Sequence, residues 1–182
     1  ALRVSRVTRG RIVVVAVEGL VLPQVLGSAS TYARAALGGV DGRALAAGMQ
    51  WAVPTASPSA ERMLPVPPLE TSGPIRAVPG PQAAHFDDRV RAAFVNADYQ
   101  VTAEADRMGV RLAGPTLAHR GSSEIVSDAT VPGSIQVPGK GQPIVLLADA
   151  QTAGGYPKIG TVIGADLARV AAARPGQVLR FA

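Results

Sequence analysis

Short apolar runs separated by glycine and proline are the main pattern along this chain. Residues 133–137 alternate between apolar and small or polar side chains, and residues 143–148 form an almost wholly apolar run that ends at Asp149. Runs of this length bounded by Gly and Pro are typical of buried strands. Further strands are predicted on the same grounds at 12–17, 99–103, 110–113 and 178–181.

Helical spacing occurs in only a few places. Phe86, Val90 and Phe94 recur on one face of residues 83–94, which predicts an amphipathic helix there. A second helix is predicted over 165–173, and a short one between the glycines of 27–39. Many short strands with two or three helices predict a mainly β fold of β-barrel type.

Proline marks the predicted boundary between two parts of the chain. Residues 54–81 are rich in Pro, with Ser and Gly between, which is typical of an extended linker or a subdomain boundary. The whole sequence has 182 residues, enough for one good core or two small ones. Aromatic residues are only 4% of it, so an aliphatic core is expected.

Composition and charge exclude several classes of site and partner. The chain has no cysteine, which excludes disulfides, thiolate metal ligands and a Cys nucleophile. The net charge of +5 comes from scattered arginines, and their densest cluster, at residues 3–11, lacks aromatic neighbours for base stacking, so a nucleic-acid partner is not expected. No run approaches the roughly 20 apolar residues that span a bilayer, so a cytoplasmic protein without a membrane partner is expected.

The loop after the run 143–148 carries the first group of candidate site residues. Asp149 and Lys158 would be the catalytic pair, an acid and an ammonium flanking a carbonyl, carboxyl or phosphoryl group. The residues between them could bind substrate through amide, hydroxyl and backbone groups: Gln151, Thr152, Gly154, Gly155 and Tyr156. The alternative interpretation is a buried structural ion pair beside a tight turn.

Other polar groups allow both a functional and a structural interpretation. Asp106, Arg107 and Arg111 could bind a carboxylate or phosphate, or form a salt-bridged turn. Residues 124–128, with two acids and a serine, could bind a cation or supply a base, or only satisfy turn backbone. The two histidines, at 85 and 119, lack metal-ligand spacing, so no metal site is predicted.

Several of these stretches resemble a known family. DRMGVRLAGP (106–115), EIVSDATVPGSIQVPGKGQPIVLLADAQTAGGYPKIGTVIGADL (124–167) and RPGQVLRF (174–181) are similar to the carboxyltransferase A–B domain family. LVLPQVLGSASTYARAALGG (20–39) and VPGPQ (78–82) match the same pattern upstream. The resemblance covers nearly the whole chain.

The resemblance implies two cyclophilin-like β-barrel subdomains. Residues 1–72 would be the C-terminal part of the first subdomain with the Pro-rich linker, and residues 73–182 would be the second subdomain. Family members usually begin well before the position of Ala1, so a fragment or processed chain is expected.

The resemblance also implies a function. The favoured expectation is a subunit of an ATP-dependent 5-oxoprolinase, which opens the cyclic amide of 5-oxoproline to glutamate together with a companion subunit similar to allophanate hydrolase subunit 1. In that reaction Arg107, Arg111 and Lys158 suit anions, Gln136 and Gln151 suit the amide, and Asp149 moves a proton or positions water. The alternatives are a biotin-dependent carboxyl transfer to urea or a related amide, and a non-catalytic regulatory subunit that binds a partner.

Overall fold

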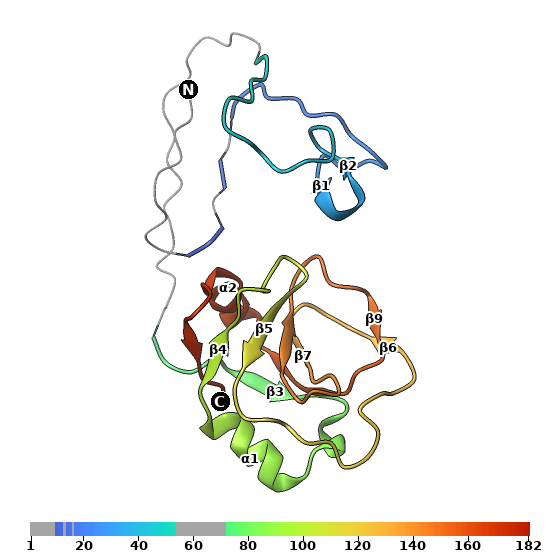
Figure 1. Cartoon of the computed structure of the whole chain (residues 1–182), viewed down its shortest axis with the longest axis vertical. Helices are drawn as coiled ribbons and strands as arrows, with labels where there is room; N and C mark the ends of the chain where they lie inside the picture. Colours follow the sequence, from blue (N-terminus) through green and yellow to red (C-terminus); the bar gives the residue numbers. More distant parts are fainter. Residues whose placement is uncertain (1–9, 13, 16, 54–71) are drawn as a thin grey trace. The chain divides into compact units, whose positions relative to one another are not determined.

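The computed structural model describes residues 10–12, 14–15, 17–53 and 72–182. These residues belong to two compact units, one made of 10–12 with 72–182 and the other lying within 14–53 (Figure 1). Most of the predicted proline-rich boundary, residues 54–71, lies outside the described residues. The assignment of 1–72 and 73–182 to two cyclophilin-like subdomains stays a prediction.

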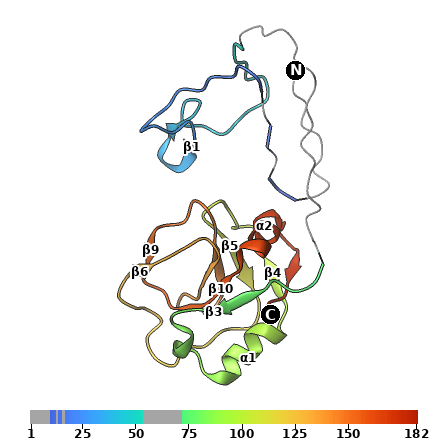
Figure 2. The same cartoon turned by 180° about the vertical axis from the view of Figure 1, so that it is seen from behind.

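The larger unit is built on one curled antiparallel sheet of seven strands, in the order β11-β4-β5-β8-β7-β10-β3. The strands are β3 (Ala77–Pro79), β4 (Tyr99–Val101), β5 (Gly109–Ala113), β7 (Ser134–Gln136), β8 (Ile144–Leu146), β10 (Lys158–Val162) and β11 (Val178–Leu179). A separate two-stranded ladder pairs β6 (Asp128–Ala129) with β9 (Ala153–Gly154) beside this sheet (Figure 2). The prediction of a mainly β fold is confirmed.

The two edges of the curled sheet meet at a parallel bridge between Ile75 and Phe181. The amide of Ile75 donates to the carbonyl of Arg180 at 2.7 Å, and the amide of Ala182 donates to the carbonyl of Ile75 at 2.9 Å. Since Ile75 precedes β3 and Phe181 follows β11, the bridge joins the two edge strands. The sheet therefore closes on itself at this point, as in a barrel.

The core fills the concave side of the sheet and contains the chain's few phenylalanines. Phe86, Phe94 and Phe181 are all buried, and the rings of Phe94 and Phe181 stack at 4.7 Å between centroids. Tyr99 is buried in the same cluster, and its ring contacts those of Phe94 and Phe181. The core is therefore not as purely aliphatic as was expected, because the few aromatic rings pack together in one cluster within it.

Two short helices lie at opposite ends of the sheet (Figure 1). Helix α1 (Asp88–Asn96) begins later than predicted, since the carboxylate of Asp87 accepts the amide of Val90 and caps it, while residues 83–85 form a separate 3-10 turn. Helix α2 (Gly164–Ala172) follows β10. No helix in the described ranges is long and apolar enough to cross a membrane.

The smaller unit contains two short strands, β1 (Thr31–Tyr32) and β2 (Leu37–Gly38). The helix predicted within 27–39 is only a 3-10 turn at Ala33–Ala35, closed by Ala36 in the left-handed conformation. Of the strand predicted at 12–17, residues 13 and 16 lie outside the described residues, and residues 12, 14, 15 and 17 are exposed and lie outside any ladder. A β-branched run forms a strand only where another strand pairs with it.

Candidate functional site

A row of side chains crosses four neighbouring strands on the side of the sheet away from the core. Arg111 of β5 is opposite Ile144 of β8, Ile144 is opposite Gln136 of β7, and Gln136 is opposite Lys158 of β10. Directly opposite residues in an antiparallel sheet project to the same face. Gln136 and Lys158, the inner pair of polar groups, are each only 2% exposed.

The β6–β9 ladder and its flanking loops cover this pair; we call residues 124–130 and 151–155 the β6–β9 cover. Its two segments are joined by backbone bonds, such as the 2.9 Å bond from the amide of Thr130 to the carbonyl of Thr152. Gly154 lies so close to Gln136 that a Cβ there would approach the amide nitrogen to 2.5 Å. Gln151 donates its amide to the Oε1 of Gln136 at 3.3 Å. The cover therefore rests directly on Gln136.

Three donors converge on the carboxylate of Asp128. The Nζ of Lys158 and the Nε2 of Gln82 each lie 2.9 Å from its Oδ2, and the amide of Ala129 lies 2.8 Å from its Oδ1. Gln82 also accepts the backbone amide of Lys158 at 3.3 Å, so it contacts both members of the ion pair. The hydrogen bond from Lys158, followed by that from Gln82, lowers the pKa of Asp128 to about 2. This carboxylate is ionised at neutral pH.

The amide nitrogen of Gln136 is buried without an acceptor among the described residues. Its oxygen accepts a hydrogen bond from Gln151, and its amide nitrogen lies next to Gly154 of the cover. A buried donor without an acceptor costs free energy, and such groups in native proteins usually have a role. An oxygen atom of a ligand would satisfy it.

Asp149 and Lys158 have different ion-pair partners in the described structure, and their assignment as a catalytic pair stays a prediction. Asp149 forms an ion pair with Arg107, with 2.8 Å between its Oδ2 and the Nε of the arginine. It follows β8 at the end of the sheet where β7 begins, while Lys158 faces the last residue of β7. The two residues therefore lie at different ends of the strands, because the segment between Asp149 and Lys158 runs back along the length of the sheet.

The remaining predicted residues fall into separate places. Arg111 lies on the same row as Lys158 but is half exposed, with Glu104 at 3.8 Å. Gln151, Thr152, Gly154 and Gly155 all belong to the β6–β9 cover, and Tyr156 follows it with 39% of its surface exposed.

The sequence interpretation overlooked Gln82 and favoured a turn role for Asp128. The motif VPGPQ contains Gln82 and was the one signal that could have found it. Asp128 is separated from Lys158 by 30 residues. Only the antiparallel pairing of β6 with β9, both two residues long, returns it to the start of β10.

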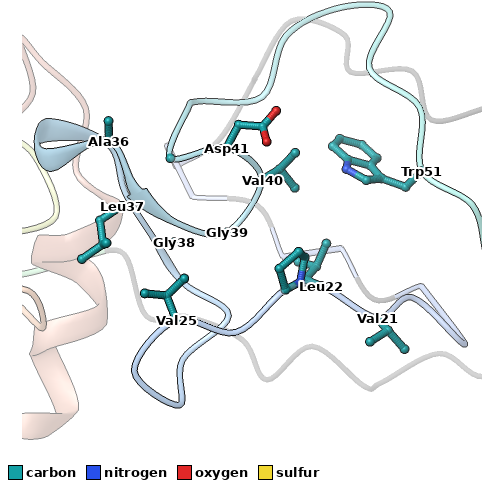
Figure 3. Close-up of a pocket in the computed structure, with 12 residues that line it drawn as sticks. Val21, Leu22, Val25, Ala36, Leu37, Gly38, Gly39, Val40, Asp41 and Trp51 are labelled. Carbon is teal, nitrogen blue, oxygen red and sulfur yellow. The ribbon is translucent and has the colours of Figure 1, made fainter.

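The smaller unit contains a pocket of about 440 Å³ (Figure 3). Its wall consists mainly of apolar side chains, among them Val40 and Trp51, and of the backbone of three glycines, with Asp41 bringing a charge. Ala36 and Asp41, which both line it, have positive φ of 50° and 53°. Such strain is frequent at binding sites, but the pocket offers little polar chemistry for an amide substrate.

Comparison with known proteins gives the family. The family described as "Carboxyltransferase domain, subdomain A and B" matches residues 1–182. This chain belongs to the carboxyltransferase A–B family. The resemblance read from the sequence motifs is thereby confirmed.

Two curated relatives in this family share a name, that of the C subunit of 5-oxoprolinase. The protein of Haemophilus influenzae is 42% identical over 164 residues, and that of Escherichia coli is 38% identical over 163 residues. Each alignment covers 90% of this chain but only 52% and 53% of the relative. The chain spans about half the length of the curated relatives it matches.

Solved structures of family members have the same fold. The crystal structure of TTHA0988 matches 86% of this chain and 30% of its own, with a TM-score of 0.68 at 37% identity. The urea amidolyase and urea carboxylase of Kluyveromyces lactis each match 88% of this chain with a TM-score of 0.70 at 26% identity. They are far longer proteins, of which the match covers 11% and 16%.

Proposed function

We propose that this chain is part of the C subunit of an ATP-dependent 5-oxoprolinase, working with a companion subunit of the allophanate hydrolase subunit 1 type. The observation that carries the proposal is the 42% identity, over 90% of the chain, to a relative with that name. The buried donors Lys158 and Gln136 support it, since the substrate has a carboxylate and an amide oxygen for them to bind.

The reaction requires the protein to bind anions and to make an amide carbon reactive. A lactam carbonyl is a poor electrophile, and transfer of a phosphoryl group from ATP to its oxygen would let water add to the carbon, with release of phosphate and cleavage of the C–N bond. Gln136 is the proposed donor to the amide oxygen, and Lys158 the cation that offsets developing negative charge. Arg111, at the exposed end of the same row, is the proposed contact for the phosphate groups of ATP.

Asp149 keeps a separate proposed role. Its carboxylate is 39% exposed and is held by Arg107, so it lies at the surface and at the other end of the strands from Lys158. We propose that Asp149 transfers a proton or positions water for a substrate that extends along residues 149–157. The substitution Asp149→Asn tests this separately from Lys158→Met, because the two residues have different partners.

The test is reconstitution of the reaction. The protein combined with its companion subunits, ATP and 5-oxoproline should form glutamate, and Lys158→Met and Gln136→Leu should each reduce kcat/KM by about 100-fold, since each removes a buried donor to the reacting group. Asp98→Asn, which breaks an exposed ion pair with Arg180, is the matched control and should keep the rate. Absence of glutamate with the complete set of subunits would reject the proposal.

A second candidate function is biotin-dependent carboxyl transfer to urea or a related amide. It is favoured by the two urea-processing neighbours with a TM-score of 0.70. In that reaction the same donors would hold the urea oxygen and the carboxylated biotin. Bicarbonate- and ATP-dependent carboxylation of urea, with a biotinylated partner supplied, separates it from 5-oxoprolinase activity.

A third candidate is a regulatory role without chemistry of its own. If Asp149→Ala and Lys158→Ala left every activity of the assembly intact and weakened only its binding to a partner, this function would replace the other two. A pull-down of the companion subunit in parallel with the activity assay provides both measurements.

A further inference from the structure

The surroundings of Asp128 resemble a binding site that is already filled. Its carboxylate takes one bond from an ammonium, one from a carboxamide and one from a backbone amide. Such a set of convergent donors is what a protein uses to bind the carboxylate of a ligand. Asp128 itself is half exposed, although the ammonium that it contacts is 2% exposed. Two of the donors, Lys158 and Gln82, thus lie outside the β6–β9 cover, while the acceptor and the amide of Ala129 belong to it.

The acceptor is also carried by a short element. Asp128 begins the β6–β9 ladder, which pairs only two residues on each strand, whereas Lys158 belongs to a five-residue strand paired on both sides. A two-stranded ladder of this length has little stability of its own. Moving Asp128 away would leave Lys158 and Gln82 in place.

A further donor adjoins this set. Gln136 lies opposite Lys158 on the next strand, and directly opposite residues have Cβ atoms about 5 Å apart. Its Nε2 has no acceptor among the described residues, so Asp128 does not use it. A ligand with two separated oxygen groups would satisfy both Lys158 and Gln136, which the aspartate alone does not.

We propose that Lys158, Gln82 and Gln136 form a carboxylate-binding cradle, which Asp128 fills in this structure and which the carboxylate of a small amide-containing acid fills in its place. The ligand carboxylate takes the bonds from Lys158 and Gln82, and its amide oxygen accepts from Gln136. Displaced Asp128 turns to solvent with the β6–β9 cover, which opens the way to the buried donors. The identity of the acid as 5-oxoproline rests on the proposed function; the cradle does not.

The direct test is to empty the cradle and refill it with acetate. Asp128→Ala leaves Lys158 without its carboxylate, and acetate should raise the midpoint temperature of this variant above its value in chloride at equal ionic strength, by an amount that grows with concentration. Asp98→Ala is the matched control, since it also removes one carboxylate from an arginine pair, but at an exposed position. An equal response of the two variants to acetate would overturn the proposal and leave an intramolecular ion pair only.

A second measurement does not depend on the variant folding. In the unsubstituted chain, acetate and 5-oxoproline should shift the side-chain amide NMR signals of Gln82, and 5-oxoproline should in addition shift those of Gln136. 2-Pyrrolidinone, which has the lactam but no carboxylate, should bind at least tenfold more weakly than 5-oxoproline. Unchanged Gln82 signals with both acids, or equal binding of the two lactams, would reject the cradle.

The outcomes separate the cradle from the proposed function. Acetate rescue of Asp128→Ala without glutamate formation by the full assembly would keep the cradle and reject the 5-oxoprolinase assignment. Glutamate formation without acetate rescue would keep the assignment and reject the cradle.

Discussion

Lys158 is the residue whose surroundings matter most for the site. Its ammonium loses nearly all its water, and such a charge is stable only with close partners of opposite charge or dipole. Asp128 supplies the charge and Gln82 fixes the geometry of both residues. Because the buried ammonium of Lys158 needs a partner of opposite charge, this position is selective for anions.

At this scale we expect an effect of acid on stability. The folded-state pKa of Asp128, about 2, is below its ordinary value of 3.8, so the folded chain binds fewer protons than the unfolded chain between these values. Its contribution to stability is complete above about pH 4 and is lost as the pH falls toward 2. Urea unfolding over this range should show a smaller loss for Asp128→Asn than for the unsubstituted chain.

Glu124→Gln, which removes one negative charge from an exposed position of the same cover, is the control. It should leave the pH dependence of stability in this acid range closer to that of the unsubstituted chain than Asp128→Asn does. Equal curves for Asp128→Asn and the unsubstituted chain would show that the ion pair does not contribute in solution.

At the scale of elements, the close approach of β3 and β10 keeps Lys158 in place. A Cβ on Gly80, just after β3, would lie 2.3 Å from the carbonyl oxygen of Lys158, so Gly80→Ala must push the strands apart. We expect it to destabilise the fold by about 1–3 kcal/mol. Gly164→Ala, at the start of α2 with open space around it, should stabilise by up to about 1 kcal/mol. Denaturant midpoints of the two variants should therefore shift in opposite directions.

Element prediction from the sequence succeeded where a local pattern was sufficient. The apolar run 143–148 contains β8, and residues 165–173 nearly coincide with α2. In the larger unit it missed β3, β6, β9 and the five-residue β10. Of these, β3, β6 and β9 are only two or three residues long and are defined by their partners across the sheet. The run at 12–17 had the right residue types, but its described residues pair with no strand in the described part of the chain.

The site was less predictable than the elements for the same reason. The structure brings together Lys158, Gln136 and Gln151, which were candidate site residues in the sequence, while their roles stay predictions. The pairing of Lys158 with Asp128 depends on a return of the chain over 30 residues, which no local spacing encodes. Asp149 was close to Lys158 in sequence and was therefore assigned to it, although β8 and β10 place them at different ends.

For the whole molecule, the hydrophobic core belongs to one part of the chain. Every residue of the core cluster lies between Ile75 and Phe181, whereas the described residues of 14–53 bury only Gly39 and Gly42. Arg11 is far from this part of the chain in sequence but contacts it, since its guanidinium donates to the carbonyls of Ala171 and Ala105.

We therefore expect a chain of residues 72–182 to fold alone. Its thermal unfolding should be cooperative, as for a small single domain, with a midpoint lower than that of the intact chain because the bonds of Arg11 are lost. Arg11→Ala in the intact chain is the control and should lower the midpoint by a similar amount. A chain of residues 72–182 that lacks a cooperative transition would show that the smaller unit is needed for folding.

The bridge between Ile75 and Phe181 brings the two ends of this compact part next to each other. A domain whose entry and exit points coincide can be placed inside a loop of another protein without pulling that loop apart. This part of the chain should also tolerate circular permutation. A short connection between its two ends, with new termini at the exposed Gly121, would leave every strand pair intact. The architecture is thus suited to reuse within much longer enzymes.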